Sequence, residues 1–358
     1  MTERRVLISG AGIAGSTLAY WMARTGWRVT VVEKAAALRS SGNPVDVRHQ
    51  AVDVASAMGI TAALRAAATH ATGMRVLDAS GRSVARLPMD SGTEIPRGDL
   101  ASLLFEAAAA DATILMDDTV TELTQDAGGV DVTFAHARPA RFDLVVGADG
   151  LHSTVRRLAF GPERDFVQHL GLYVATVSLG APSWNPTEVL LYNTPGRLLS
   201  VHPGRGDALA AFIFRHPWTP DPGPRDLVTS AYENAGWRTR ELLTHLTTTD
   251  LYFDAVSRVS LPSWTRGRVT LLGDAASCVS LFGDGSSLAM AGAYTLAAAL
   301  TDEADVATAL RRYETRHRTL TDPKQRHIGR TTGLLVPRTR PGLTARNAAA
   351  RVWSARAA

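Results

Sequence analysis

Apolar residues cluster in short runs near the start of the chain, and helical periodicity separates the first two runs. Residues 6–9 and 27–32 are predicted to be buried strands, and residues 16–25 between them have the spacing of a helix. Two later apolar runs, at 142–146 and 268–272, predict further strands, and the small residues at 286–300 predict another helix. Strands that alternate with helices are typical of an α/β domain with a parallel sheet.

A second sheet is predicted in the middle of the chain. The segments 171–179, 188–192, 198–202 and 209–215 are strand-like, residues 225–246 are predicted to be helical, and residues 251–261 lead back to the first domain. A length of 358 residues corresponds to two domains at about 150 residues each. We therefore predict an α/β domain combined with a second domain built on a mixed β-sheet.

The turn between the first strand and the first helix has the sequence Gly10-Ala-Gly12-Ile13-Ala14-Gly15. In a G-x-G-x-x-G turn the first glycine permits the tight turn, the second lets a pyrophosphate approach, and the third packs helix against strand. Glu33 ends the second strand, where a carboxylate can accept hydrogen bonds from both ribose hydroxyls. Because its charge would repel a 2′-phosphate, this pocket is predicted to bind NAD or FAD and not NADP.

Two later motifs favour the longer of these cofactors. Asp149-Gly150 follows the strand at 142–146, with Ser153 as a cap for the next helix, and Asp274 follows the strand at 268–272. Open α/β sheets place ligands at the carboxyl ends of their strands. Gly285-Ser286 begins the last of these helices, where free amides favour negative charge. A simple NAD dehydrogenase does not need these late elements, whereas FAD needs them to hold its far end.

The motifs from Val6 to about Arg318 together resemble, in the same order, those of the FAD-dependent aromatic hydroxylases, the para-hydroxybenzoate hydroxylase superfamily. The resemblance implies a Rossmann-like FAD-binding domain at residues 1–71, 96–164 and 262–318, an interleaved substrate domain at 72–95 and 165–261, and a C-terminal helical segment at 319–358. It also implies that the ADP half of FAD is bound by Gly10, Gly12, Ile13, Ala14, Gly15, Glu33 and Lys34.

Further cofactor contacts follow from the same resemblance. Arg97, in the segment Ile-Pro-Arg-Gly-Asp-Leu, is expected to reach the flavin half, with an arginine that merely flanks a helix as the alternative. Asp149 matches an Asp-Gly motif tied to FAD and the pyridine nucleotide, with a tight structural turn as the alternative. Asp274 matches the aspartate near the ribityl or pyrophosphate region. The isoalloxazine is expected between the helix start at Gly285 and Ser286 and the second domain.

The segment 39–48 is similar to a loop of the tetracycline-inactivating monooxygenases. The similarity implies that Arg39 contacts the nicotinamide cofactor and that Asp46 contacts FAD, with Arg48 on the same loop. For Arg39, a solvated surface position is an equal alternative.

The chain departs from the family pattern in the loop 277–285. The proline expected before Gly-x-Gly is absent, and the loop looks one residue short. Asp284, commonly glutamine in relatives, would place a carboxylate near the flavin, where it could alter the reaction with oxygen.

The resemblance implies a monooxygenase that takes electrons from NADPH or NADH, bound transiently, and uses O2. One oxygen atom would enter an aromatic or polyketide-like molecule through a flavin C4a-hydroperoxide, as in a tailoring enzyme of antibiotic biosynthesis. The altered loop leaves open an FAD-dependent dehydrogenase or reductase without oxygen insertion. A non-enzymatic FAD-holding protein whose basic tail docks a partner is a further alternative.

The substrate is expected to lie against the second sheet. The candidates for the pocket wall are Tyr173, Tyr192, Phe212, Phe214 and Trp218, with core positions as the alternative for each. No catalytic acid or base can be assigned, and the nearest candidates are His49, His202 and His216. No Cys/His spacing predicts a metal site, and no G-x-S-x-G nucleophile motif is present.

Composition and charge limit the classes of protein to which the chain can belong. The single cysteine, Cys278, excludes an internal disulfide, and the five residues before the first strand leave no room for a secretory leader. Residues 324–358 contain eight basic and no acidic residues, but the arginines lie singly without interleaved aromatics, so a solvated helix is favoured over nucleic-acid binding. We expect a cytoplasmic monomer or weak dimer that binds neither membrane nor nucleic acid.

Overall fold

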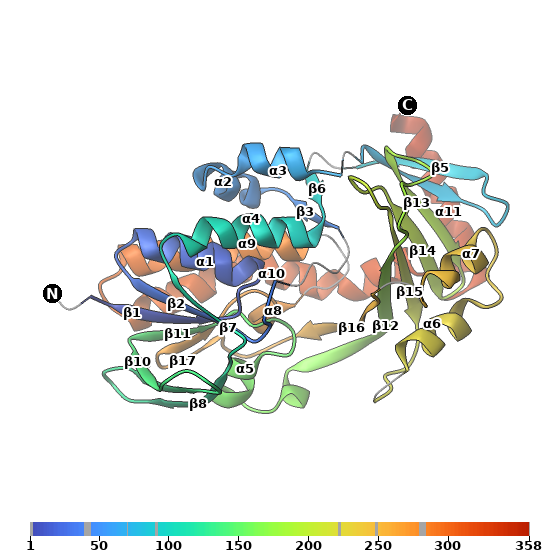
Figure 1. The fold of residues 1–358 in the computed structure, drawn as a ribbon. Helices are drawn as coiled ribbons and strands as arrows, with labels where there is room; N and C mark the ends of the chain where they lie inside the picture. Colours follow the sequence, from blue (N-terminus) through green and yellow to red (C-terminus); the bar gives the residue numbers. More distant parts are fainter. Residues whose placement is uncertain are drawn as a thin grey trace.

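The computed structural model describes residues 3–38, 44–69, 71–89, 92–220, 223–247, 250–278 and 284–357. Across these residues the chain forms two β-sheet units that stand side by side, with one long helix passing from the first unit to the second (Figure 1). The predicted mixed α/β class, with a Rossmann-like first unit and a second sheet, is confirmed.

The first unit is built on a six-stranded sheet. Its strand order is β17 (Thr265–Arg266), β18 (Val269–Leu271), β11 (Leu144–Gly147), β1 (Arg5–Ser9), β2 (Arg28–Glu33) and β7 (Thr113–Met116). All neighbours are parallel except β17 and β18, so the carboxyl ends of the other strands meet at one edge. The four predicted strands of this domain are β1, β2, β11 and β18, which confirms the βαβ unit.

Both faces of this sheet are covered (Figure 1). On one side lie α1 (Ile13–Arg24), α4 (Arg97–Ala109) and α9 (Asp284–Asp302); on the other lie α5 (Thr154–Ala159) and a small antiparallel sheet of β8 (Val120–Gln125), β9 (Val130–Phe134) and β10 (Ala140–Phe142). Strands covered on both faces must be apolar along their length. This burial explains why β1 and β11 are continuous apolar runs in the sequence.

The second unit is a seven-stranded sheet. Its order is β16 (Tyr252–Val259), β12 (Val167–Ser178), β15 (Leu209–Arg215), β14 (Arg197–His202), β13 (Glu188–Thr194), β4 (Gly73–Leu77) and β5 (Ser83–Pro88). Only β13 and β4 pair in parallel; the other neighbours are antiparallel. The four strands predicted in the middle of the chain are present, and β4 and β5 extend the sheet with residues from much earlier in the sequence.

One face of the second sheet is covered by α6 (Pro224–Tyr232) and α7 (Thr239–Thr244), two helices where the sequence predicts one helical segment. The break lies at Gly236 and Trp237. The amide of Gly236 donates to Tyr192 Oη at 3.0 Å, and Trp237, at φ 53°, donates its amide to Ala79 O at 3.0 Å. These contacts tie the break to the sheet, so it is a tertiary feature that periodicity does not reveal.

A two-stranded sheet lies at the junction of the two units (Figure 1). In it β3 (Val45–Val47) pairs antiparallel with β6 (Thr93–Ile95), which sets Asp46 opposite Glu94. The remaining short elements are α2 (Gln50–Ala57), α3 (Thr61–Ala67), the 3₁₀ turn η1 (Glu163–Asp165) and α8 (Asp274–Ser277). β6 therefore pairs with the early segment that contains Asp46 and not with the seven-stranded sheet, although its residues fall in the range expected for the substrate domain.

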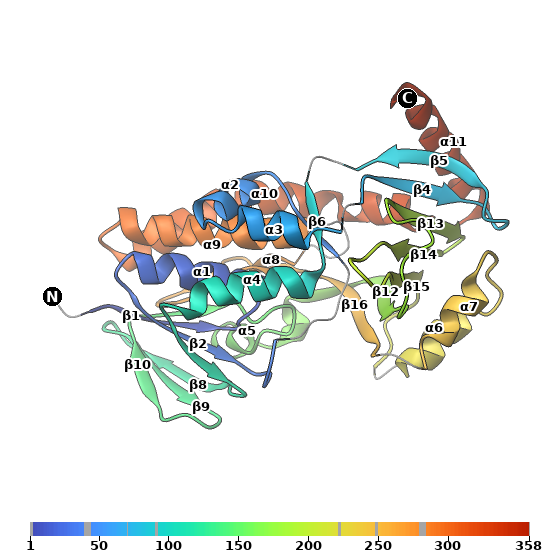
Figure 2. The same ribbon diagram turned by 45° about the horizontal axis from the view of Figure 1, so that its top comes forward.

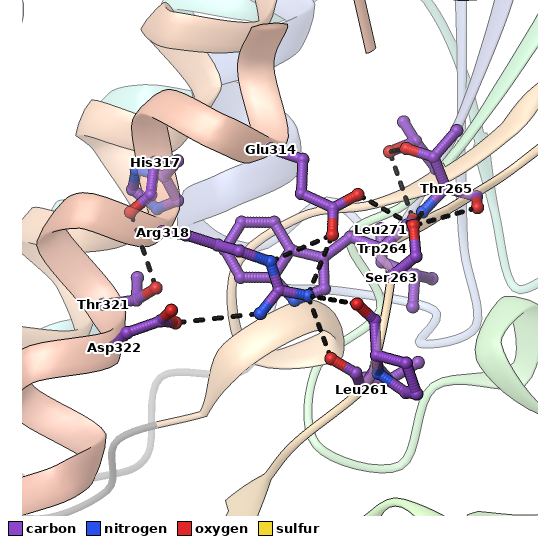
Figure 3. Close-up of polar contacts among 12 residues, drawn as sticks. Leu261, Ser263, Trp264, Thr265, Leu271, Glu314, His317, Arg318, Thr321 and Asp322 are labelled. Atoms are coloured by element: carbon purple, nitrogen blue, oxygen red, sulfur yellow. Dashed lines mark hydrogen bonds and ion pairs between the residues drawn. The ribbon is translucent and has the colours of Figure 1, made fainter. Parts of the chain in front are cut away.

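The helix α10 (Val306–Leu335) runs without a break across the expected boundary at residues 318–319, and α11 (Arg340–Ala357) then lies along β5 (Figure 2). Arg318 anchors the first half of α10: its guanidinium lies 4.5 Å from the centre of the Trp264 ring and donates to Leu261 O at 2.9 Å (Figure 3). Arg346 of α11 donates to Asn193 Oδ1 at 2.7 Å. The basic tail is thus packed onto the second unit as a terminal helix.

Candidate functional site

The glycine-rich turn lies at the carboxyl end of β1, where α1 begins. Gly10 has φ 102°, and a Cβ there would lie 2.5 Å from Ala148 O. A Cβ on Gly15 would lie 1.9 Å from Gly10 O, whereas a Cβ on Gly12 would meet no protein atom within 4 Å. Packing within the protein therefore requires the first and third glycines, and the space beside the second is left for a ligand.

The start of α1 faces this turn. Gly12 is its N-cap and supplies no side-chain hydrogen bond, and Ile13 and Ala14 form the first helical residues. Uncapped amides at a helix N-terminus, combined with the helix dipole, favour a bound anion. The open position at Gly12 and this helix end together fit the diphosphate of a dinucleotide.

Glu33 lies beside the same turn at the end of β2. Its Oε2 accepts a hydrogen bond from Ala11 N and its Oε1 from Ala35 N, each at 2.9 Å. A carboxylate oxygen can accept two hydrogen bonds, so both remain able to accept from a ribose hydroxyl. Lys34 is exposed next to it. The residues expected around the ADP half of FAD are thus close together and fit that group.

Asp149 lies on the turn after β11. Its Oδ1 accepts from Ser153 Oγ at 2.5 Å and its Oδ2 from Val155 N at 3.0 Å, and Ser153 Oγ accepts from Arg156 N, which confirms Ser153 as the cap of α5. Burial raises the pKa of Asp149, and these hydrogen bonds oppose that shift. The contacts are those of a structural turn, and a contact of Asp149 with FAD stays a prediction.

Arg97 and Asp274, far apart in the sequence, come together near the carboxyl edge of the first sheet. Arg97 begins α4 and Asp274 begins α8. Burial raises the pKa of Asp274, and the positive charge of Arg97 opposes this. Two residues of β16 that the sequence did not single out share this environment: Tyr252 Oη donates to Asp254 Oδ2 at 3.3 Å, and burial raises the pKa of Tyr252 while Arg97 opposes it.

His152, on the turn after Asp149, is also near this edge. Its Nδ1 lies 3.0 Å from Glu163 Oε1 and its Nε2 lies 3.9 Å from Asp254 Oδ1. Interaction with Asp254 and Glu163 raises its pKa to about 9 against the cost of burial. The imidazole is therefore cationic at neutral pH and adds positive charge beside the Asp149-Gly150 turn.

The start of α9 is joined to β3 through Ser287. Its Oγ donates to Asp46 O at 2.8 Å and accepts from Arg48 N at 2.9 Å. Asp46 Oδ2 forms an ion pair with Arg48 at 2.8 Å, and burial raises the pKa of Asp46 against the effect of that arginine. Three predicted contacts, Asp46, Arg48 and the Gly285-Ser286 helix start, are thereby brought together. Arg39 lies outside the described residues.

The altered loop is described only at its ends, since residues 279–283 lie outside the described ranges. Asp284 is the first residue of α9, and its Oδ2 lies 2.5 Å from Lys324 Nζ of α10. A Cβ on Gly285 would meet no protein atom within 4 Å. Asp284, which departs from the family pattern, thus has Lys324 as its cationic partner. The space beside Gly285 at the start of α9 is not filled by protein atoms.

A further pair links the two units at the same junction. Glu94 of β6 points its Oε2 to within 3.9 Å of His202 Nδ1 on β14, and its Oε1 accepts from Thr69 Oγ1 at 2.7 Å. Ser200 Oγ lies 3.0 Å from the other ring nitrogen of His202. The sequence pointed to His202 only as one of three candidate histidines and did not single out Glu94, although Glu94 directly precedes the Ile-Pro-Arg segment.

The other two candidate histidines occupy different surroundings. His49 is exposed and precedes α2 at φ 51°, and His216 Nδ1 lies 2.8 Å from Pro217 O. In the described ranges no group of three or more His, Cys, Asp or Glu could hold a metal ion, and every helix there is too short or too polar to cross a membrane.

The aromatic residues proposed for the pocket wall lie elsewhere. Tyr192, Phe212 and Phe214, with Tyr173, fill the core between the second sheet and the helices α6 and α7. Neighbours along each strand point to opposite faces, so the face turned toward the first unit carries Ser200 and His202 of β14 instead. Trp218 is 62% exposed. This placement matches the core alternative and does not support a substrate contact for these side chains.

Known proteins resemble this chain over most of its length. The family model described as FAD binding domain matches residues 3–322. The chain is 36% identical over 319 residues to an uncharacterised protein of Mycobacterium tuberculosis, covering 83% of this chain and 85% of that protein. It is 31% identical over 339 residues to a flavin-dependent monooxygenase of Legionella longbeachae, covering 90% and 87%. The crystal structure of tetracycline destructase Tet(55) superimposes with a TM-score of 0.86 at 31% identity, covering 100% of this chain and 97% of that chain.

Proposed function

The chain belongs to the FAD-dependent aromatic hydroxylase superfamily, whose FAD binding domain spans most of its length, and from this premise we propose that it is an NADPH- or NADH-dependent monooxygenase. Its substrate is a small aromatic or polyketide-like molecule, into which it inserts one oxygen atom from O2.

The junction between the two units carries this proposal. There β6 approaches β14 of the second sheet, with Glu94 Oε2 3.9 Å from His202 Nδ1. β6 pairs with β3, and Ser287 at the start of α9 donates to Asp46 O of β3. A hydroxylase needs its substrate between the reactive end of FAD and a second wall. Polar groups at this junction are able to orient such a substrate, while the apolar aromatics of the second sheet face away from it.

FAD, when bound, supplies electron transfer from the nicotinamide donor and activation of oxygen. The open turn at Gly12 and the carboxylate of Glu33 bind its ADP half. Arg97 and Asp274 would lie near its flavin half, and the amides at Gly285 and Ser286 would stabilise negative charge there. These residues orient the cofactor and exclude water, and the second sheet closes the reacting side.

The substrate class rests on the chemistry of the relatives. Tet(55) is called a tetracycline destructase. Tetracycline, as a chemical, is a polyketide that carries phenol and enol hydroxyls. Its 31% identity over the whole chain makes a polycyclic phenol or enol the first candidate class for this protein.

The dehydrogenase alternative rests on the altered loop 277–285, of which residues 279–283 lie outside the described ranges. At the end of that loop the Asp284 carboxylate is paired with Lys324, which favours the monooxygenase. The interaction-protein alternative depended on a free basic tail, whereas α11 lies along β5. We also propose a cytoplasmic monomer or weak dimer, which size-exclusion chromatography with light scattering tests directly.

The test uses purified protein, NADPH or NADH, tetracycline and ¹⁸O2. We expect a yellow protein with a flavin absorbance spectrum, consumption of the donor that increases with substrate, and a product heavier by one ¹⁸O atom. If the bound flavin is reduced and the substrate is converted without gaining ¹⁸O, the protein is a dehydrogenase or reductase instead.

A further inference from the structure

Among the described residues, three acid–base pairs at the junction of the two units bear on this inference. Asp46 is paired with Arg48 at 2.8 Å, and Asp284 is paired with Lys324 at 2.5 Å. The third pair, Glu94 and His202, is open: its closest atoms are 3.9 Å apart, beyond hydrogen-bonding distance. Within the described residues His202 Nδ1 is buried and has no hydrogen-bond partner. The acid and base of the first two pairs are therefore in direct contact, whereas in the third pair the imidazole is not engaged by its carboxylate and can take up a proton.

We propose that His202 accepts the proton of an acidic phenol or enol hydroxyl on the substrate, and that Glu94 holds the imidazole in place and stabilises the imidazolium that forms. The inference rests on the function proposed above and names the substrate group on which that function acts. His202 is a catalytic residue in this scheme, and Glu94 is a positioning residue.

The geometry assigns the two ring nitrogens different tasks. Nδ1 faces the carboxylate of Glu94, so the neutral ring is favoured in the tautomer that carries its proton on Nδ1. Nε2 is then the acceptor, and Ser200 Oγ donates to it at 3.0 Å in the absence of substrate. The same division of labour between a carboxylate, an imidazole and a hydroxyl is found in hydrolytic triads. Here Ser200 keeps the ring oriented.

Among the three members of this group, the imidazole is the one that a small molecule can reach. The exposed fraction of the His202 side chain is 18%, whereas that of the Glu94 side chain is 9% and Ser200 is buried. Leu199 and Val201 of β14 belong to the core beneath α6 and α7, so His202 lies on the opposite face of the sheet, where Glu94 of β6 approaches it to 3.9 Å. A substrate between the units would therefore contact the imidazole edge before it contacted either neighbour.

The surrounding charges keep Glu94 ionised. Burial raises the pKa of Glu94, but His202, Thr69 and Arg48 together outweigh it and hold that pKa below its ordinary value. Among the described residues, two neighbouring carboxylates already have cationic partners: Asp46 is paired with Arg48, and Asp284 is paired with Lys324. The Glu94 carboxylate therefore faces the ring, where it can stabilise the positive charge that the imidazole gains when it accepts a proton.

The proton-transfer step is balanced without any redox partner. The O–H bond of the substrate breaks, its proton forms an N–H bond with His202 Nε2 in place of the Ser200 hydrogen bond, and the electron pair stays on the substrate oxygen. The products are an oxyanion and an imidazolium beside the Glu94 carboxylate. An ionised hydroxyl makes its ring more electron-rich, which is the state that an electrophilic oxygen donor attacks.

The experiment measures ionisation on the oxidised holoenzyme, without NADPH or NADH, so it is independent of oxygen insertion. The probes are 4-nitrophenol and tetracycline, whose anions absorb at longer wavelength, each at about one pH unit below its own pKa. We expect wild-type protein to bind a probe as its anion, with the ratio of anion to neutral form raised about tenfold. His202→Gln should abolish this increase, Glu94→Gln should reduce it, and Glu94→Asp should retain part of it.

Two controls separate proton transfer from a structural role. His216→Gln changes a histidine of the same unit that has no carboxylate partner in the described ranges, and it should leave the increase unchanged. Added imidazole should restore the increase to His202→Ala, provided that flavin absorbance and thermal unfolding show that variant to be folded and loaded.

The proposal is overturned if wild-type protein binds neither probe as its anion, or if His202→Gln binds the anion equally well. Ionisation of a probe without ¹⁸O insertion would instead contradict the proposed monooxygenase function and leave the role of His202 standing. If ¹⁸O is inserted and the His202→Gln variant ionises the probe as well as wild type does, the monooxygenase function stands and the role of His202 is wrong.

Discussion

Lys324 Nζ lies 2.5 Å from Asp284 Oδ2, joining the middle of α10 to the first residue of α9. These residues are 40 positions apart, and Lys324 is one of only two lysines in the chain. Arg318 fixes the neighbouring turn of α10 against Trp264 and Leu261 (Figure 3), so the lysine approaches Asp284 from a well-anchored helix. The ion pair neutralises a carboxylate where the flavin is expected.

Replacing Lys324 with methionine should leave Asp284 unpaired at this helix start. Negative charge would then oppose reduced, anionic flavin, and we expect a more negative midpoint potential and FAD affinity weakened about tenfold, equivalent to about 1.4 kcal/mol. Asp284→Asn in the same chain should restore both properties. Potentiometric titration and FAD binding measure the effect, with exposed Arg326→Met as the matched control. An unchanged potential in Lys324→Met would exclude an electrostatic role.

Gly12 and Gly15 of the motif should respond differently to alanine. At Gly12 a Cβ meets no protein atom, so Gly12→Ala should leave the stability of the apoprotein within about 0.5 kcal/mol of wild type and weaken FAD binding at least about tenfold. At Gly15 a Cβ would lie 1.9 Å from Gly10 O, so Gly15→Ala should destabilise the apoprotein itself by about 1–3 kcal/mol. Urea unfolding and FAD titration distinguish them; equal losses of stability would contradict this division.

Phe212 tests the assignment of the aromatic residues to the core. Because its side chain is fully buried against Tyr232, Phe212→Ala should cost about 3–5 kcal/mol of unfolding free energy. Trp218→Ala, at an exposed position, should change stability by no more than about 0.5 kcal/mol. Denaturant unfolding gives both values. If Phe212→Ala has normal stability but binds substrate more weakly, Phe212 lines the substrate pocket and its assignment to the core is wrong.

His317 should make stability depend on pH. Burial lowers its pKa to about 4 from 6.5, so the unfolded chain binds a proton more readily than the folded one between these values. Stability contributed by the neutral ring is therefore present above pH 6.5 and is lost as pH falls toward 4. Between pH 7 and pH 5 the loss is about 2 kcal/mol.

His317→Gln should remove this part of the pH dependence, as measured by urea unfolding at both pH values. Exposed His327→Gln serves as the control and should keep the wild-type dependence. If wild type and His317→Gln lose the same stability on acidification, other groups are responsible.

The first unit was predictable because its signals are local. A tight turn, a helix start and an acidic residue at a strand end recur within one βαβ segment, so Gly10, Gly12, Gly15 and Glu33 are recognisable from spacing alone. The strand positions were equally clear, since burial on both faces forces continuous apolar runs. The break between α6 and α7 was missed because contacts with Tyr192 and Ala79 produce it.

The second sheet shows the limit of such reasoning. Alternation along β14 and β15 shows that two faces exist, but it does not say which face meets the first unit. Phe212 and Phe214 were therefore natural candidates for the pocket, and tertiary packing placed them against the helices instead. Glu94 was missed because the residue it approaches, His202, lies more than a hundred residues later in the chain. Lys324 was not connected with Asp284 either, because the two residues are 40 positions apart and meet only through the packing of α10 on α9.

By itself the sequence determined the class of fold, the dinucleotide turn and the family, because each depends on residues whose neighbours in the chain are also their neighbours in space. The tertiary structure decided which ionisable groups meet at the junction: Asp46 with Arg48, Asp284 with Lys324, and Glu94 with His202 across a 3.9 Å gap. Electrostatic interaction depends on distance in space and on burial, and neither quantity can be read from spacing along the chain.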